Sequence, residues 1–224
     1  MATTLRRRLG TIARRLARAH GAVPAPRRLP PLDELVLTIL SQNTNDTNRD
    51  RAYADLRHAF PTWDEVADAP VPAIARAIRS GGLAPTKAPR IRQVLRALRS
   101  DGVPLDERTL RGLDDDALWD WLVGLPGVGP KTAACVLLFS LNRPFFPVDT
   151  HIHRIAIRLG LVPPNATAIA TQAALQRAIA PAAVYQAHMD LIRHGRQVCV
   201  ARRPLCSVCA LADLCSRIGV SDAR

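Results

Sequence analysis

Four of the chain's five cysteines lie within 17 residues near its C-terminal end. The intervals between Cys199, Cys206, Cys209 and Cys215 are six, two and five residues. One close pair flanked by two single cysteines suits a metal better than disulfides, and nothing in the sequence resembles a secreted, disulfide-rich domain. Structural zinc sites usually have two close pairs a dozen or more residues apart. On spacing alone, zinc and an iron–sulfur cluster remain alternatives, because four thiolates hold either one.

A second chemical feature is the run Leu-Pro-Gly-Val-Gly-Pro-Lys at residues 125–131. Gly127 and Gly129 allow a tight turn and a close approach of the backbone to a ligand. Pro130 suits the first position of a helix, which we expect from about 130 to 141. Unpaired backbone N–H groups at such a helix start favour an anion, such as a DNA phosphate.

Lys131 follows this turn and is one of only two lysines, with Lys87, among the 31 basic residues. The positive end of a helix dipole, together with partial burial, favours the neutral form of its amine. A neutral amine is a nucleophile, which arginine at this position could not be. The alternative is a lysine that only binds phosphate.

Asp149 is the only carboxylate between Asp120 and Asp190, and it directly precedes an apolar helical pattern. It fits the N-cap of that helix. It also fits an acid–base role, and the two roles are compatible.

The charge balance indicates a polyanionic partner. There are 31 basic and 19 acidic residues, which gives a net charge of +12 and a pI of about 11.0. Such a charge favours nucleic acid first and a membrane surface second. Residues 191–212 contain no acid and include Arg202 and Arg203, so phosphate contacts are expected there. Residues 1–28 hold eight arginines and no acid, and they predict a basic amphipathic helix. Its polar face is either simply solvated, or the helix is a mitochondrial transit peptide. The absence of serine from this segment argues against the transit peptide.

The elements that must position these residues are helices. Eighteen prolines punctuate the chain, and alternating β-branched runs are scarce. Apolar residues at helical spacing predict helices over 33–41, 71–80, 88–100, 114–123 and 165–180. The predicted class is all-α. No apolar run is long enough to span a membrane, and we expect a monomer in the cytoplasm, associated with the nucleoid.

Taken together, the segments LPGVGPKTA, VDTHIHRIAIRLG and HGRQVC and the cysteine spacing resemble endonuclease III, a bifunctional DNA glycosylase of the helix-hairpin-helix base-excision superfamily. The resemblance covers about residues 33–216. It implies two helical domains flanking a DNA-binding cleft. Residues 33–143 would form a helical barrel with the helix-hairpin-helix motif. Residues 1–32 plus 144–224 would form the other domain, with a [4Fe–4S] cluster held by Cys199, Cys206, Cys209 and Cys215.

The resemblance also implies an activity on double-stranded DNA with damaged or abasic sites. Lys131 matches the family's Schiff-base nucleophile and Asp149 its catalytic aspartate. The reaction would remove an oxidised pyrimidine and then nick the abasic site by β-elimination. The expected DNA contacts are Gln42, Asn43, Gly127, Gly129, Thr132, His151, Arg202 and Arg203.

Two departures from the family pattern bear on substrate choice. Pro130 stands where a basic residue often precedes the lysine, and Asn43 stands where a glutamine commonly fills the gap left by the flipped base. Two other functions agree with parts of the pattern. One is a mismatch glycosylase of the same superfamily that uses water as nucleophile, and the other is a non-enzymatic helix-hairpin-helix DNA-binding protein. In those mismatch glycosylases the lysine position is usually another residue, so Lys131 argues against the first. The second gives no reason for Lys131 and Asp149 to occur together.

Overall fold

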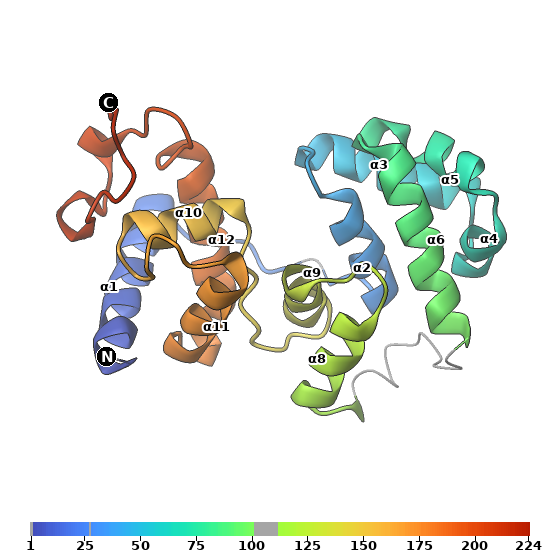
Figure 1. Cartoon of the computed structure of the whole chain (residues 1–224), viewed down its shortest axis with the longest axis horizontal. Helices are drawn as coiled ribbons and strands as arrows, with labels where there is room; N and C mark the ends of the chain where they lie inside the picture. Colours follow the sequence, from blue (N-terminus) through green and yellow to red (C-terminus); the bar gives the residue numbers. More distant parts are fainter. Residues whose placement is uncertain (1, 27, 101–111) are drawn as a thin grey trace. The chain divides into compact units, whose positions relative to one another are not determined.

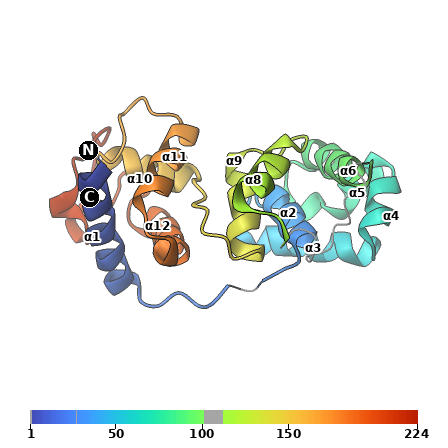
Figure 2. The same cartoon turned by 90° about the horizontal axis from the view of Figure 1, so that it is seen from below.

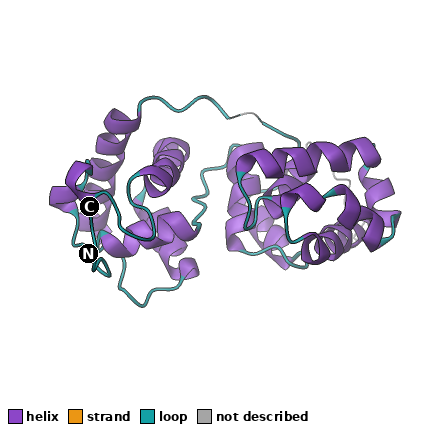
Figure 3. Cartoon of the chain, turned by 90° about the horizontal axis from the view of Figure 1, so that it is seen from above, coloured by secondary structure: helices purple, strands orange, loops and turns teal. Residues whose placement is uncertain are grey.

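A computed structural model describes residues 2–26, 28–100 and 112–224 (Figure 1). These residues form helices, short helical turns and loops, and no strand occurs among them (Figure 3). The all-α prediction is therefore confirmed. Within the same ranges, no helix is both long enough and apolar enough to cross a membrane.

The chain divides into two compact units, which we describe separately. Unit 1 comprises residues 1–26 and 144–224, and unit 2 comprises residues 27–143. The second division coincides with the boundary expected after residue 143. The first lies six residues before the expected start at residue 33.

Unit 2 is a bundle around α2. Its main helices are α2 (Pro31–Leu40), α3 (Asp46–Ala59), α4 (Trp63–Asp68), α5 (Val71–Ala77), α6 (Ala84–Ser100), α8 (Asp115–Gly124) and α9 (Pro130–Cys135). The apolar face of α2 is fully buried, and this helix contacts α3, α6 and α9. It therefore fixes the positions of the elements that surround it.

Capping side chains explain where several of these helices begin. Asn45, Thr62 and Asp114 each accept a hydrogen bond from a backbone N–H three residues later. Two predicted helices are divided in the structure. The one expected at 71–80 becomes α5 and a 3-10 turn (Arg79–Gly81), and the one expected at 130–141 becomes α9 and a π-helical turn (Val136–Ser140).

Unit 1 is built on α12 (Val184–Gln197), which packs against α1 (Ala2–His20) and α10 (Thr150–Arg158), as Figure 2 shows. Helix α11 (Ala168–Ala178) contacts both α1 and α10. The basic helix α1 buries Leu9, Ile12 and Leu16. Arg8 donates to the carbonyl of Leu159 at 2.6 Å, just beyond the end of α10, so part of the positive charge of α1 is used inside the unit.

Candidate functional site

The glycine hairpin joins α8 to α9 in unit 2. The Val128 amide donates to the carbonyl of Leu125 at 3.0 Å and closes the turn. Leu125 and Val128 are buried, whereas Gly127 and Gly129 are exposed. Gly127 has a φ of +76°, a left-handed conformation that favours glycine. Apolar anchors thus hold the turn to the core and leave both glycines at the surface.

Lys131 lies in the first turn of α9, which begins at Pro130 after Gly129 as N-cap. Lys131 is half-buried, while residues 132–135 are buried. A helix fixed on its inner side therefore positions a lysine whose side chain reaches the surface. Thr132 is only 4% exposed, because α9 turns its side chain toward the core.

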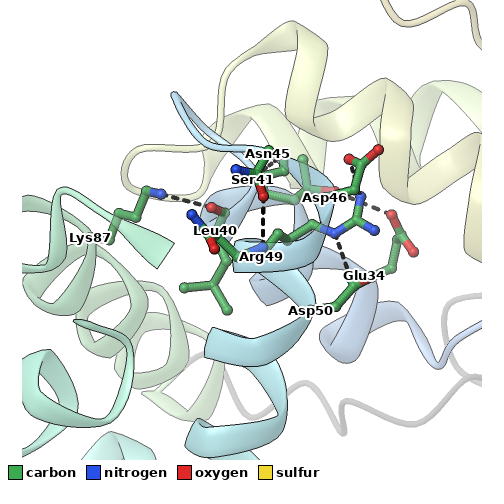
Figure 4. A network of polar contacts seen from close by, with 10 residues as sticks. Glu34, Leu40, Ser41, Asn45, Asp46, Arg49, Asp50 and Lys87 are labelled. Carbon is green, nitrogen blue, oxygen red and sulfur yellow. Dashed lines mark hydrogen bonds and ion pairs between the residues drawn. The ribbon is translucent and has the colours of Figure 1, made fainter. Parts of the chain in front are cut away.

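The segment Ser41–Asn45 follows α2 and contains the predicted gap-filling residues. Asn43 is exposed and has a φ of 51°, a conformation that asparagine tolerates better than most residues. Lys87 anchors the start of this segment, since its Nζ donates to the carbonyl of Leu40 at 2.7 Å (Figure 4). The same Nζ also donates to the carbonyl of Gly81 at 2.8 Å. Burial lowers the pKa of Lys87. The second lysine therefore supports the loop at the end of α2, where helix carbonyls attract a cation.

Arg90 connects this loop to the hairpin. Its Nη1 donates to Oε1 of the half-buried Gln42 at 2.9 Å. The same side chain covers Gly127 so closely that a Cβ there would lie 2.9 Å from it. Two of the predicted DNA-contacting segments thus share one arginine, a residue that the sequence pattern did not single out.

Asp149 belongs to unit 1 and caps α10, as the sequence predicted. Its Oδ1 accepts from the amide of Ile152 at 2.8 Å, and the residue is half-buried. The two residues before it, Pro147 and Val148, are buried, and His188 Nδ1 lies 3.0 Å from the carbonyl of Pro147. The carboxylate is consequently held by packing before it and by the helix after it.

His151 stands in the first turn of α10 and is half-buried. Its Nδ1 is 3.2 Å from Nη2 of Arg154, and its side chain lies against Gly195 of α12, where a Cβ would come within 2.8 Å of it. The close crossing at Gly195 explains the glycine of the HGRQVC segment. His151 is therefore packed on one side, with the remaining part of its surface open.

The four clustered cysteines line one common cavity with Ile155, Leu159 and His194. All four are free thiols of intermediate exposure. Among the residues that the structure describes, no three Cys, His, Asp or Glu side chains converge closely enough to hold one metal ion. A single zinc needs its thiolates about 2.3 Å from one point. Four thiols around a shared cavity instead fit a larger, polynuclear group.

Arg154 and Arg158, one turn apart on α10, form hydrogen bonds to the segment that contains Cys199. Arg154 donates to the carbonyls of Cys199 at 2.8 Å and Gly195 at 2.9 Å. Arg158 is 7% exposed and donates to Cys199 Sγ at 3.3 Å and the carbonyl of Val200 at 2.7 Å. Neither role was predicted from the sequence. The signal was the placement of two arginines four residues apart, and so one helical turn apart, on α10.

Backbone amides also reach the thiols of two other clustered cysteines. The amides of Leu211 and Arg217 each donate at 3.4 Å, to Cys209 Sγ and Cys215 Sγ respectively. Burial raises the pKa of both thiols and lowers the pKa of the neighbouring His194 to about 4. His194 is thus neutral, with Nε2 lying 3.5 Å from Cys209 Sγ.

Arg202 and Arg203 lie on the loop between the first two clustered cysteines, and both are exposed. Arg203 is already paired, since its Nε lies 3.2 Å from Oδ2 of Asp222. The two arginines are therefore not equivalent as candidate phosphate contacts, which their adjacency in the sequence did not reveal.

Comparison with known proteins identifies both parts of the chain. Residues 36–181 match the family described as HhH-GPD superfamily base excision DNA repair protein. Residues 199–215 match the iron–sulfur binding domain of endonuclease III, and this range begins and ends at the outer clustered cysteines. The second match supports a [4Fe–4S] cluster, and its range contains Cys199, Cys206, Cys209 and Cys215.

The chain is also similar to individual relatives. It is 32% identical to endonuclease III of Thermotoga maritima over 216 residues, which cover 95% of this chain and 94% of that protein. It is 43% identical to a protein of Arabidopsis thaliana named as a putative DNA glycosylase, over 74% of this chain. This match spans only 56% of the Arabidopsis protein.

The chain is also similar to solved structures of DNA glycosylases. A non-covalent endonuclease III–DNA complex matches with a TM-score of 0.80 and 26% identity, over 95% of each chain. A trapped covalent endonuclease III–DNA intermediate matches with a TM-score of 0.79 and 26% identity, over 97% of this chain and 96% of that one. A thermostable thymine-DNA glycosylase shares the fold, with a TM-score of 0.77 at 21% identity.

Proposed function

Because the chain belongs to the endonuclease III family of helix-hairpin-helix base-excision DNA glycosylases, we propose that it is a bifunctional member that also cleaves the abasic site through Lys131. The observation that carries this proposal is the placement of Lys131. It occupies the first turn of a helix whose following residues are buried, directly after the exposed hairpin. Its half-buried side chain reaches the surface beside the hairpin, where an amine can meet a substrate.

The proposed reaction begins with a damaged base that has left the duplex stack, at a cost of a few kcal/mol. The amine of Lys131 attacks C1′ of the deoxyribose, and the bond from C1′ to the base breaks. The C1′–O4′ bond then opens, O4′ takes the proton that the nitrogen loses, and the sugar is held as an imine. The imine acidifies the C2′ proton. Loss of that proton expels the 3′ phosphate by β-elimination, so the strand is cut without hydrolysis.

Asp149 is proposed as the carboxylate that stabilises positive charge developing on the sugar. The helix cap uses Oδ1, which leaves Oδ2 as the oxygen to face a substrate. Asn caps helices as well as Asp does. Asp149→Asn should therefore keep the fold and bind abasic DNA while reacting at least about 10²-fold more slowly.

The proposed substrate is an oxidised pyrimidine, and the proposal rests on the similarity to endonuclease III. The exposed Asn43 is the residue proposed to fill the gap in the duplex, with Gln42 held beside it by Arg90. Gly127 and Gly129 are proposed to hold a phosphate next to the lesion. A mismatch glycosylase using water would leave Lys131 without a task.

The cluster is proposed to act as a structural clamp. Four cysteine thiolates of residues 199–215 would hold it, as cysteine thiolates hold other iron–sulfur clusters. A bound cluster would cross-link this segment of the chain. Arg202 lies on the loop so closed and would contact a phosphate. We further propose that the protein acts as a monomer on the DNA of the nucleoid.

Borohydride reduction during reaction with duplex DNA tests the function. Wild-type protein should form a covalent adduct with DNA that contains thymine glycol or an abasic site, and Lys131→Gln should form none. Duplexes with a guanine–thymine mismatch serve as the substrate control. If Lys131→Gln still gave an adduct, the nucleophile would be another amine. If only the mismatched thymine were removed, the substrate assignment would be wrong.

A further inference from the structure

His194 is a buried histidine on α12 and the first residue of the HGRQVC segment, and the proposed reaction gives it no task. It is 2% exposed and lines the cavity that the four clustered cysteines share. The ring nitrogens of a histidine this buried need partners within the protein, because an unpaired buried polar atom costs free energy. The contacts of these two nitrogens therefore indicate what the residue does.

Each ring nitrogen of His194 faces a partner. Nε2 lies 3.5 Å from Sγ of Cys209, and Nδ1 lies 3.4 Å from Nε2 of His20. The ring centroids of the two histidines are 5.6 Å apart. This separation is close to the distance between the two nitrogens plus the distance from each nitrogen to its own centroid, so the two nitrogens point at each other. The three residues thus form a chain of polar contacts from α1 to the cavity.

His20 is held on α12 by a second contact. It ends α1 and is half-buried, and its carbonyl accepts a hydrogen bond from Nη1 of Arg193 at 2.5 Å. Arg193 directly precedes His194. Two adjacent side chains of α12 therefore contact the same residue of α1, one at its backbone and one at its ring, and all of them belong to unit 1.

The direction of these hydrogen bonds follows from the chemistry of the sulfur. A cysteine sulfur bonded to iron has lost its proton, so it accepts hydrogen bonds and donates none. With Cys209 as a proposed ligand, the hydrogen atom between the two residues must lie on Nε2 of His194. A neutral imidazole carries one such hydrogen, so Nδ1 is then an acceptor. Nε2 of His20 must donate to it.

We propose that His194 is a positioning residue for the cluster, which donates from Nε2 to Sγ of Cys209 while His20 holds it in the required tautomer. This rests on the proposed ligation of the cluster by Cys209. An N–H group aimed at a ligand sulfur offsets part of the negative charge of that sulfur, and so favours the state of the cluster that holds one more electron. The last residue of the basic helix α1 thereby supports the cluster.

The midpoint potential of the bound cluster, measured by spectroelectrochemistry on the whole chain, tests the inference. His194→Phe keeps an aromatic ring and removes the donor, so the potential should shift to lower values. His194→Gln keeps an N–H donor and should shift less. His20→Phe leaves Nδ1 of His194 without its donor and should give a smaller shift in the same direction. His58→Phe, the same change at an exposed site on α3, should match the wild type.

Resonance Raman spectra in H₂O and D₂O give a second readout, which a purely structural role of His194 would not move. The iron–sulfur bands of the wild type should shift in D₂O, because the hydrogen on Nε2 exchanges with solvent. The shift should shrink in His194→Phe without vanishing, since the amide of Leu211 also donates to Cys209 Sγ. The shift in His58→Phe should equal that of the wild type.

A double variant tests whether the two histidines act as one chain. His20→Phe combined with His194→Phe should have the potential of His194→Phe alone, because His20 acts only through His194. Additive shifts would overturn the chain, as would an iron-loaded His194→Phe with the potential and D₂O shift of the wild type.

His20→Phe keeps His194 and all four thiols, so it decides the matter even where His194→Phe loads no iron. An unchanged potential in His20→Phe would overturn the inference. A wild type that binds no iron would instead overturn the proposed cluster, and with it the ligand on which the inference rests. Borohydride trapping through Lys131 is a separate measurement, so the proposed lyase reaction stands or falls independently of the histidines.

Discussion

Arg90 donates from Nη1 to Oε1 of Gln42 at 2.9 Å, and its aliphatic part lies over Gly127. One side chain on α6 therefore links the loop after α2 to the glycine hairpin. In the proposed complex these segments contact the DNA beside one damaged nucleotide. Their mutual positions are set before DNA arrives, which lowers the cost of ordering them on binding.

Arg90→Ala should show whether Arg90 aids DNA binding by linking the two segments or only by its positive charge. Hydrogen bonds to a charged group contribute about 1.5–3 kcal/mol, so the dissociation constant for an abasic duplex should rise by about tenfold or more. Arg76→Ala removes an arginine from the same unit that does not touch the hairpin, and it is the matched control. Fluorescence anisotropy at one fixed salt concentration measures both. Equal reductions of affinity in the two variants would show that Arg90 contributes charge alone.

Gly127→Ala should damage the hairpin in two ways. A residue with a side chain costs about 1–2 kcal/mol at a left-handed φ such as +76°, and the added Cβ would lie 2.9 Å from Arg90. Urea unfolding should show lower stability, and DNA affinity should fall with it. In the double variant with Arg90→Ala, the protein should regain only the stability lost through contact between the added Cβ and Arg90. Gly124→Ala, at a helix end with open space around it, should leave stability unchanged or raise it.

Arg158→Met should loosen the start of the cluster loop, because it removes hydrogen bonds to Cys199 and Val200 while keeping an apolar side chain of similar length. The expected result is less iron per protein after purification and faster bleaching of the visible absorbance in air. Arg18→Met, an exposed change on α1 in the same unit, is the control. Identical iron content in both variants would mean that the arginine does not support the cluster.

Arg202 and Arg203 should differ in their effect on the salt dependence of DNA binding. Removing one side chain that neutralises a phosphate reduces the slope of log K against log salt by about 0.9. Arg202→Ala should show a reduction of this size. Arg203→Ala should show less, because Arg203 is paired with Asp222 in the free protein. Asp222→Asn should then strengthen binding slightly, and equal slopes for the two arginine variants would rule out this distinction.

Local spacing was enough to predict the features that depend on neighbours in the sequence. The cysteine set, the start of α9 and the cap by Asp149 all follow from residues within a few positions of one another. Helix α3 was not predicted from the sequence. Only Ala52 and Leu56 are buried along it, so its apolar residues do not recur at helical spacing.

Features that depend on distant contacts could not be predicted in this way. Glu34 looked like an acid placed to suit a helix N-terminus, and only the folded structure shows that it is buried, at 8% exposure. Thr132 directly follows the lysine, yet the rotation of α9 places it in the core. The pairing of Arg203 with Asp222 likewise depends on how the C-terminal segment folds back.

The folding stability should also depend on the charge of Glu34, a carboxylic acid in the first turn of α2 that is only 8% exposed. Its pKa rises from 4.5 to about 7 on burial. A raised carboxyl pKa contributes stability that is full below 4.5 and is lost as pH rises through about 7. The wild type should therefore lose on the order of 3 kcal/mol relative to Glu34→Gln between these limits. Urea unfolding of both proteins at about pH 5 and about pH 8 measures the difference, with Glu65→Gln expected to follow the wild type. Parallel pH dependence in the two proteins would contradict the burial of an ionising carboxyl at this position.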